Sequence, residues 1–210
     1  TKNLMFKTTD ASAPLTTYDS EFMHNRSWNF VGNPYPSYYD TEFMDFRARI
    51  TVWNMNSKNY EAMRPGDDEY VLCPGEGFFV QCPEDKEAIL FNPSGRQTTR
   101  EVRAAAARTR GEEASRAIFN ICMSYGDNTD RARIVINEKA SAQFELDKDA
   151  GKFFSTETSM PLIYTAADGE NYAINERPLG DGIVNLCVTD RSGAYCTITL
   201  AEDVADYETT

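Results

Sequence analysis

The chain has 210 residues, of which 41% are hydrophobic and 12% aromatic, and this composition argues against intrinsic disorder. Its net charge of -12 would repel nucleic-acid phosphates and anionic lipids, so DNA, RNA and membrane surfaces are not expected partners. No apolar run approaches the ~20 residues that span a bilayer, which argues against an integral membrane protein.

The two ends of the chain predict a piece of a longer protein. The first residues lack the basic flank and apolar core of a signal peptide, and the chain starts without Met. We therefore expect any export signal to be encoded outside this sequence.

Strand signals dominate the first half. Short runs rich in aromatic and β-branched residues, bounded by Gly, Pro, Asn or Asp, predict strands at residues 27–32, 49–54, 77–81 and 87–91. Residues 32–36, Gly-Asn-Pro-Tyr-Pro, predict a rigid corner, because each proline restricts the residue before it.

Two smaller features follow from the same stretch. The bond between Tyr35 and Pro36 is a candidate for the cis form. Residues 40–45 predict a single helical turn, with Asp40 as its N-terminal cap.

A basic stretch separates the halves. Residues 99–113 have the only composition that favours a longer helix, but they lack a sustained apolar face. We interpret residues 96–115 as a flexible or loosely helical linker, with modules at 1–107 and 108–210. No aromatic residue interleaves the arginines to stack on bases, so docking onto the acidic body or solubility explains the charge better than nucleic-acid binding.

The second half also predicts strands, at residues 117–124, 131–136, 161–166, 183–189 and 194–200. In the second of these, Ala132 alternates with Arg131 and Arg133, so the arginine face, which also carries Val135, is expected to meet water. The spacing of strands and turns predicts an all-β fold: two small antiparallel β-sandwich modules, jelly-roll-like, in tandem, with few or no helices.

Five cysteines and one histidine give neither a CxxC pair nor a zinc-finger spacing. A hairpin made of residues 183–189 and 194–200 would place Cys187 opposite Cys196, within reach of a disulfide. Two small, buried, reduced cysteines are the other interpretation.

Several motifs occur together in a recognisable order. They are WNFVGNPYPS at 28–37, ITVWN at 50–54, PGEGFFV at 74–80, NTDR at 128–131, DAGKFF at 149–154, PLIYT at 161–165, DGE at 168–170 and AIN at 173–175. This order resembles the C-terminal region of large secreted and surface proteins of Bacteroidetes-type bacteria, many exported by the type IX route.

The resemblance implies a β-sandwich region of an exported protein, secreted or on the exterior of the outer membrane, and it implies no catalytic residues. Relatives continue with further strands after the segment matching residues 192–198, whereas this chain stops soon afterwards. An open sheet edge is therefore expected if the last strands of the second sandwich are missing.

The sequence contains only weak indications of a catalytic site or a metal-binding site. His24 is the only histidine, and there is no GxSxG elbow or phosphate-binding loop, so no enzyme and no cofactor is predicted. Possible Ca²⁺ ligands lack EF-hand spacing and are residues that turns use anyway, so no metal is predicted. These are Asp127, Asn128, Thr129, Asp130, Asp147, Asp149 and Asp181.

Aromatic residues give the remaining candidate site. Tyr35, Tyr38 and Tyr39 lie on the corner after the first predicted strand, with Trp28 and Trp53 on neighbouring strands. Such rings can stack on sugars, or they can fill a core and close its end.

Two functions stay open. The first is adhesion, interaction or domain spacing, with another surface protein as partner. The second is a glycan-binding accessory region of a secreted polysaccharide-degrading enzyme, with a polysaccharide as partner. An independent hydrolase is a third and less favoured candidate.

Overall fold

The computed structural model describes residues 11–65, 70–83, 86–101, 116–155, 160–189 and 195–203. Within these ranges every regular element is a β-strand, apart from three short 3-10 helices, and most strand pairs are antiparallel. The prediction of an all-β fold of the β-sandwich class is confirmed, whereas the jelly-roll detail stays a prediction. No helix in these ranges is long and apolar enough to cross a bilayer.

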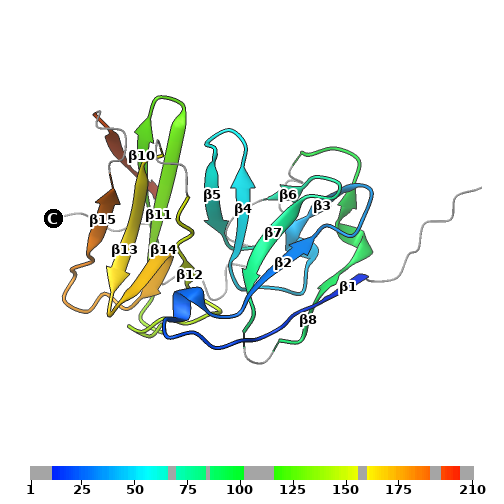
Figure 1. Ribbon diagram of the computed structural model, residues 1–210, viewed down its shortest axis with the longest axis horizontal. Helices are drawn as coiled ribbons and strands as arrows, with labels where there is room; N and C mark the ends of the chain where they lie inside the picture. The colour runs from blue at the N-terminus through cyan, green and yellow to red at the C-terminus, as the bar shows by residue number, and fades with distance from the viewer. Residues whose placement is uncertain are drawn as a thin grey trace, which may run out of the picture.

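The first half of the chain forms three sheets around one apolar core (Figure 1). The largest has the order β2 (Trp28–Gly32), β7 (Gly77–Gln81), β4 (Ile50–Asn54) and β5 (Asn59–Met63). The others are β6 (Val71–Leu72), β3 (Tyr38–Asp40) and β9 (Arg96–Gln97), and the pair β1 (Ala11–Pro14) and β8 (Ala88–Phe91). Alternate residues of these strands, such as Val31, Ile50, Phe78 and Phe91, fill the core.

Local predictions for this half have mixed outcomes. The four predicted strands match β2, β4, β7 and β8, and Asp40 caps η2 (Thr41–Phe43) by accepting a bond from the Glu42 amide. The described residues contain no cis peptide bond, so the cis candidate before Pro36 is wrong. The other 3-10 helices are η1 (Met23–Asn25) and η3 (Pro93–Gly95).

The second half forms one seven-stranded sheet. Its order is β15 (Leu186–Thr189), β13 (Leu162–Ala167), β14 (Glu170–Arg177), β11 (Asn128–Ile136), β10 (Ala117–Tyr125) and β16 (Thr197–Asp203), with β12 (Ala150–Gly151) also paired to β14. All pairs are antiparallel except β11 with β14. The first part of β14 pairs with β13 and the last part with β11, while Ile163 packs on Met123 and Ala132, so the sheet folds back over itself.

The predicted hairpin with Cys187 opposite Cys196 is wrong. β15 pairs with β13 and β16 with β10, at opposite edges of the sheet, and Cys187 lies across from Tyr164. All five cysteines are free, so there is no disulfide between Cys187 and Cys196. The two strands follow each other in sequence, but each extends a different side of the sheet.

The predicted linker is only partly described. Arg96 and Gln97 pair with β3, so the start of the linker belongs to the first half. The predicted boundary near residue 108 lies outside the described residues.

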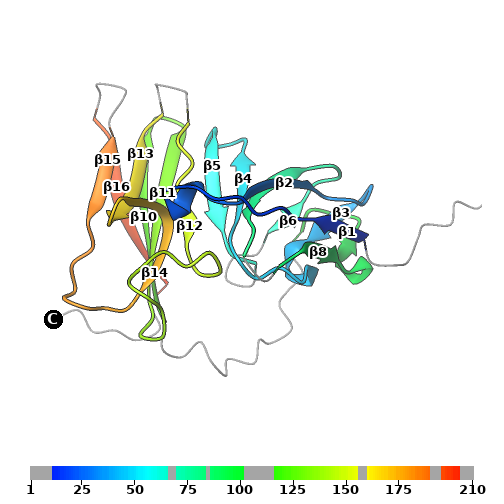
Figure 2. The same cartoon turned by 60° about the horizontal axis from the view of Figure 1, so that its bottom comes forward.

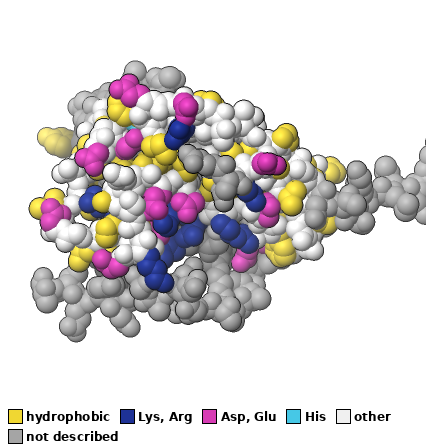
Figure 3. All heavy atoms as spheres, turned by 90° about the horizontal axis from the view of Figure 1, so that it is seen from below, with side chains coloured by type: hydrophobic (Ala, Val, Ile, Leu, Met, Phe, Trp, Pro, Cys, Tyr) yellow, Lys and Arg dark blue, Asp and Glu magenta, His cyan; other side chains and the backbone are white. Residues whose placement is uncertain are grey.

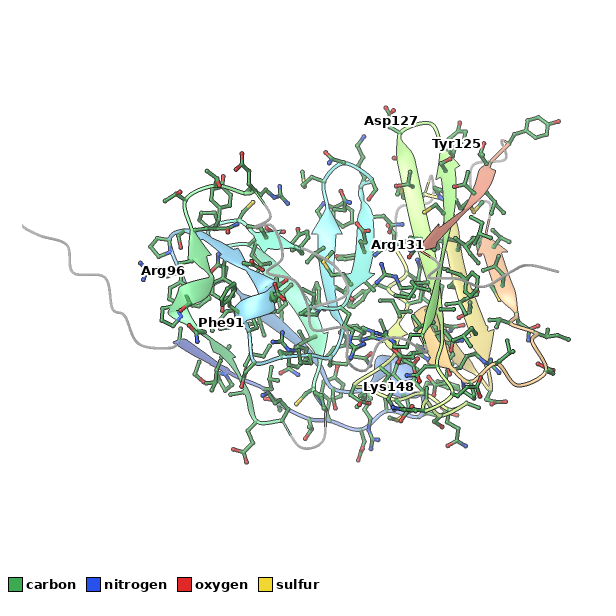
Figure 4. The ribbon with its side chains drawn as sticks, turned by 180° about the vertical axis from the view of Figure 1, so that it is seen from behind. Phe91, Arg96, Tyr125, Asp127, Arg131 and Lys148 are labelled. Atoms are coloured by element: carbon green, nitrogen blue, oxygen red, sulfur yellow. The ribbon has the colours of Figure 1, made fainter. Side chains whose placement is uncertain are left out.

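The halves pack directly against each other, with β5 beside β11 and η1 reaching across to β12 (Figures 1 and 2). The arginine face of β11, expected to meet water, instead faces the first half, so that prediction is wrong. Val135 is fully buried in a cluster that includes Ala62 of β5. The Arg131 guanidinium, labelled in Figure 4, donates to the Ala62 carbonyl at 2.8 Å and lies 3.2 Å from the Glu61 carboxylate. We call this contact surface the seam.

Candidate functional site

The face of the β2-β7-β4-β5 sheet that points away from the core is aromatic. Because strand side chains alternate, Trp28, Phe30, Phe79, Trp53 and Tyr60 share this face. Strand pairing sets Phe30 opposite Phe79 and Trp53 opposite Tyr60, with ring centroids 4.8 and 5.0 Å apart. The sheet therefore presents a row of contacting rings toward the second half.

Phe153, which follows β12 in the second half, inserts into this row. Its ring centroid lies 4.5 Å from Trp28, 4.9 Å from Phe79 and 5.0 Å from Tyr60. Contacts at these separations add to the stabilisation that burial of the rings provides. The six rings Trp28, Phe30, Trp53, Tyr60, Phe79 and Phe153 form the aromatic band.

An open groove of about 460 Å³ runs beside Phe153. Two of its rings remain accessible, because Phe30 is 68% and Phe154 41% exposed. The groove is lined by His24, Asn25, Trp28, Asn29, Phe30, Phe79, Lys152, Phe153 and Phe154. We call it the aromatic groove.

Gly77 explains how Phe30 lies in this groove. A β-carbon at position 77 would sit 2.2 Å from the Phe30 ring, so the ring occupies the space that any other side chain would fill. The glycine thereby lets an exposed phenyl ring lie across the neighbouring strand.

His24 fastens one wall of the groove to the second half. Its Nδ1 lies 2.7 Å from the Glu170 carboxylate, which also accepts bonds from the Met23 and His24 amides at 2.7 and 2.8 Å. The Trp28 indole donates to the His24 carbonyl at 2.9 Å. The histidine thus holds η1 on β14 and positions the Trp28 ring.

Lys152 fixes the other wall. Its ammonium group donates to both Asp130 oxygens at 2.5 and 2.6 Å, and both side chains are almost fully buried. The Ile163 amide also donates to Asp130, at 2.7 Å. Burial lowers the pKa of Lys152, and the Asp130 carboxylate opposes that shift. The pair anchors the backbone that carries Phe153 and Phe154.

The aromatic residues predicted from sequence separate into two groups. Trp28 lines the groove, and Trp53, 40% exposed, ends the aromatic band. Tyr35 and Tyr39 are buried in the core of the first half, where their rings stack at 5.5 Å and the Tyr35 hydroxyl donates to the Phe91 carbonyl. Tyr38 is half-buried in β3. The three tyrosines therefore form no exposed platform.

Sequence reasoning missed Phe30, Phe79, Phe153, Phe154 and Tyr60. Trp28 and Phe30 are two residues apart on one strand, so their shared face could have been found from alternation alone. The insertion of Phe153 had no local signal, since its partners lie more than 70 residues away in sequence.

The acidic residues considered as metal ligands have structural contacts or lie apart. Asp130 holds Lys152, Asp149 accepts the Glu145 and Glu176 amides, and Asp181 accepts the Ile183 amide. Asp127 lies at the turn between β10 and β11 (Figure 4). Among the described residues, no three His, Cys, Asp or Glu side chains come together as a metal site would require.

Comparison with known proteins found no matching family model, no matching curated protein and no matching solved structure. The description of this molecule therefore rests on its fold and its groove. It is an all-β protein with an aromatic groove between two halves.

Proposed function

We propose that this chain is a non-catalytic β-sandwich region of a secreted or cell-surface bacterial protein, acting in adhesion, interaction or domain spacing. The observation that carries the proposal is the seam. A unit that holds neighbouring domains or a binding surface in place needs its parts fixed relative to each other. A buried interface between the halves supplies that rigidity.

Buried charges support the rigidity of the seam. The Arg49 guanidinium of the first half lies 2.6 Å from the Glu176 carboxylate of the second half, and both side chains are 3% exposed. Arg116 and Asn137 also donate to Glu176, at 3.1 and 2.7 Å. Separation of the halves would break the ion pair between Arg49 and Glu176, and breaking a buried ion pair is costly.

His24 contributes to the rigidity of the seam. Its ring nitrogen and its amide are both bound to Glu170, so the only histidine of the chain acts as a clamp between the halves. Secretion or surface display is supported by the sequence resemblance alone.

Labelling of intact cells tests the location. An antibody against this chain should stain unpermeabilised cells of the bacterium that encodes it, and external protease should remove the signal. Staining that requires permeabilisation would contradict a surface or secreted role.

The aromatic groove favours glycan binding as a second candidate function. Exposed aromatic faces stack on sugar rings, and Phe30, Trp28 and Phe154 present such faces in one groove. A chain with net charge -12 fits a neutral polysaccharide better than an anionic one.

Affinity electrophoresis through gels containing neutral polysaccharides tests this candidate. Retardation of the wild type should be lost on Phe30→Ala and kept on Leu90→Ala, because Leu90 is an exposed apolar residue of β8 outside the groove. Absence of retardation in every polysaccharide, or equal loss in both variants, would argue against the groove as a glycan site.

A further inference from the structure

The ion pair of Lys152 and Asp130 is buried and unusually close. The two side chains are 2% and 1% exposed, and the Lys152 Nζ lies 2.6 and 2.5 Å from the Asp130 Oδ1 and Oδ2. Charged N–H···O bonds usually measure about 2.7–2.9 Å. A nitrogen that is this close to both oxygens also lies close to the carboxyl carbon that joins them.

Two other lysine pairs of the described residues have the ordinary geometry. Lys148 contacts one Glu145 oxygen at 2.8 Å, and Lys86 contacts one Asp45 oxygen at 2.8 Å. Their side chains are 25% and 27% exposed, so water reaches both ammonium groups. Lys152 differs from both in its burial and in its contact with two oxygens.

The backbone holds both reacting groups in place. Asp130 belongs to β11 and pairs with Met123 of β10, while the Lys152 amide donates to the Asn171 carbonyl of β14 at 3.0 Å. Neither side chain has to move for the nitrogen to meet the carboxyl carbon. Groups fixed at such a distance react as if one were present at about 10⁵ M or more, which favours condensation.

Burial also favours the uncharged forms that condensation requires. An amine attacks a carbon only when it is neutral, and burial lowers the pKa of Lys152. The positive charge of Arg131 lowers that pKa further, while the Asp130 carboxylate opposes both effects. Transfer of one proton from Lys152 to Asp130 gives a neutral amine and a neutral carboxyl group, and it removes two charges from an apolar interior.

The amide of Ile163 distinguishes the two carboxyl oxygens of Asp130. It donates to Oδ2 at 2.7 Å. A fixed N–H group stabilises the negative charge that develops on a carbonyl oxygen during attack on its carbon. Oδ2 is therefore suited to remain as the carbonyl oxygen, and Oδ1 is suited to leave.

We propose that Lys152 and Asp130 form an intramolecular isopeptide bond that links β11 to the segment after β12. The Lys152 Nζ forms a bond to the Asp130 Cγ, and the bond between Cγ and Oδ1 breaks. Oδ1 leaves as water, with its own proton and one from the amine, so nothing is oxidised or reduced and no co-reactant is needed. Lys152 lines the aromatic groove, which gives the water a way out.

The cross-link goes beyond the function proposed above and does not rest on it. Mass spectrometry of the full chain under denaturing conditions tests it, because ion pairs do not survive denaturation. The wild type should weigh less than its sequence by one water molecule. Trypsin should yield the peptide with Asp130 joined to the peptide with Lys152. It should cleave after Lys148 but not after Lys152, because an acylated lysine is not a substrate.

Two variants assign the lost water to this pair. Lys152→Met should have the full mass of its sequence, whereas the matched control Lys148→Met should keep the deficit of one water. A wild-type mass equal to that of the sequence would overturn the proposal. A deficit that persists in Lys152→Met, or that fragmentation locates at other residues, would also overturn it. The wild-type measurement decides the question even if Lys152→Met folds poorly.

Discussion

One buried ionisable residue, Asp149, links the stability of the seam to pH. Asp149 is 3% exposed, and its two oxygens accept the Glu176 and Glu145 amides at 2.7 Å each. Burial raises the pKa of Asp149 to about 7, although those amides and the Arg49 charge favour the ionised form. Glu176, whose amide Asp149 holds, is the residue that binds Arg49 across the seam.

This pKa predicts a pH dependence of stability. Because the folded value of about 7 exceeds the ordinary 3.8, folding favours the protonated carboxyl group. Protonation of Asp149 stabilises the folded protein fully below about pH 4. This stabilisation is lost as pH rises through 7, and the free energy of unfolding falls by up to about 4 kcal/mol in total.

Urea unfolding of the wild type and Asp149→Asn at several values between pH 5 and 8 measures this effect. The wild type should lose stability relative to Asp149→Asn as pH rises. Asp147→Asn, at an exposed neighbouring position, should leave the wild-type slope unchanged. A constant difference between the wild type and Asp149→Asn at every pH would contradict the prediction.

At the scale of elements, composition identified strands but not their partners. Runs of aromatic and β-branched residues predicted β2, β4, β7, β8, β10 and β13, because such runs fit a pleated, half-buried surface. Strands of two or three residues, such as β3 and β12, carry too little pattern to be found. The predicted hairpin of β15 and β16 is wrong because β15 pairs with β13 and β16 with β10, and such pairings are decided by long-range packing rather than by proximity in sequence.

The residues of the candidate site were likewise only partly predictable from the sequence. Trp28 and Trp53 were identified from the sequence, and both belong to the aromatic band. Tyr35 and Tyr39 are also aromatic and lie between Trp28 and Trp53 in sequence, but their rings are buried in the core. Whether an aromatic ring is exposed depends on how the sheets pack on each other, and the local sequence pattern does not show this.

The contact between η1 and β12 gives a prediction for one element. A β-carbon on Gly151 would lie 2.6 Å from the His24 carbonyl oxygen, so Gly151→Ala must displace η1 and weaken the bond from His24 to Glu170. We expect a loss of about 1–3 kcal/mol in the free energy of unfolding, measured by urea titration.

Gly32→Ala is the control, because its nearest neighbouring atom would be 3.9 Å away. Equal stability of the two variants would show that η1 does not pack tightly on β12.

At the scale of the whole molecule, the seam joins two sheet systems that share no strand. Its contacts are aromatic around Phe153, apolar around Ala62 and charged around Glu176. On the face shown in Figure 3, basic and acidic side chains lie close together, with hydrophobic side chains between them. The aromatic groove lies at the seam, whereas β15, an edge strand of the seven-stranded sheet among the described residues, lies at the far end of the second half (Figure 1).

Differential scanning calorimetry of the wild type, Phe153→Ala and Phe154→Ala tests the rigidity of the seam most directly. The wild type should unfold in one transition whose calorimetric and van't Hoff enthalpies agree. Phe153→Ala should lower the melting temperature or divide the transition in two, since about 2–4 kcal/mol of ring packing is removed from the seam. Phe154→Ala, at a 41% exposed position, should change the melting temperature little. Two separate transitions in the wild type, neither of them shifted by Phe153→Ala, would contradict the account.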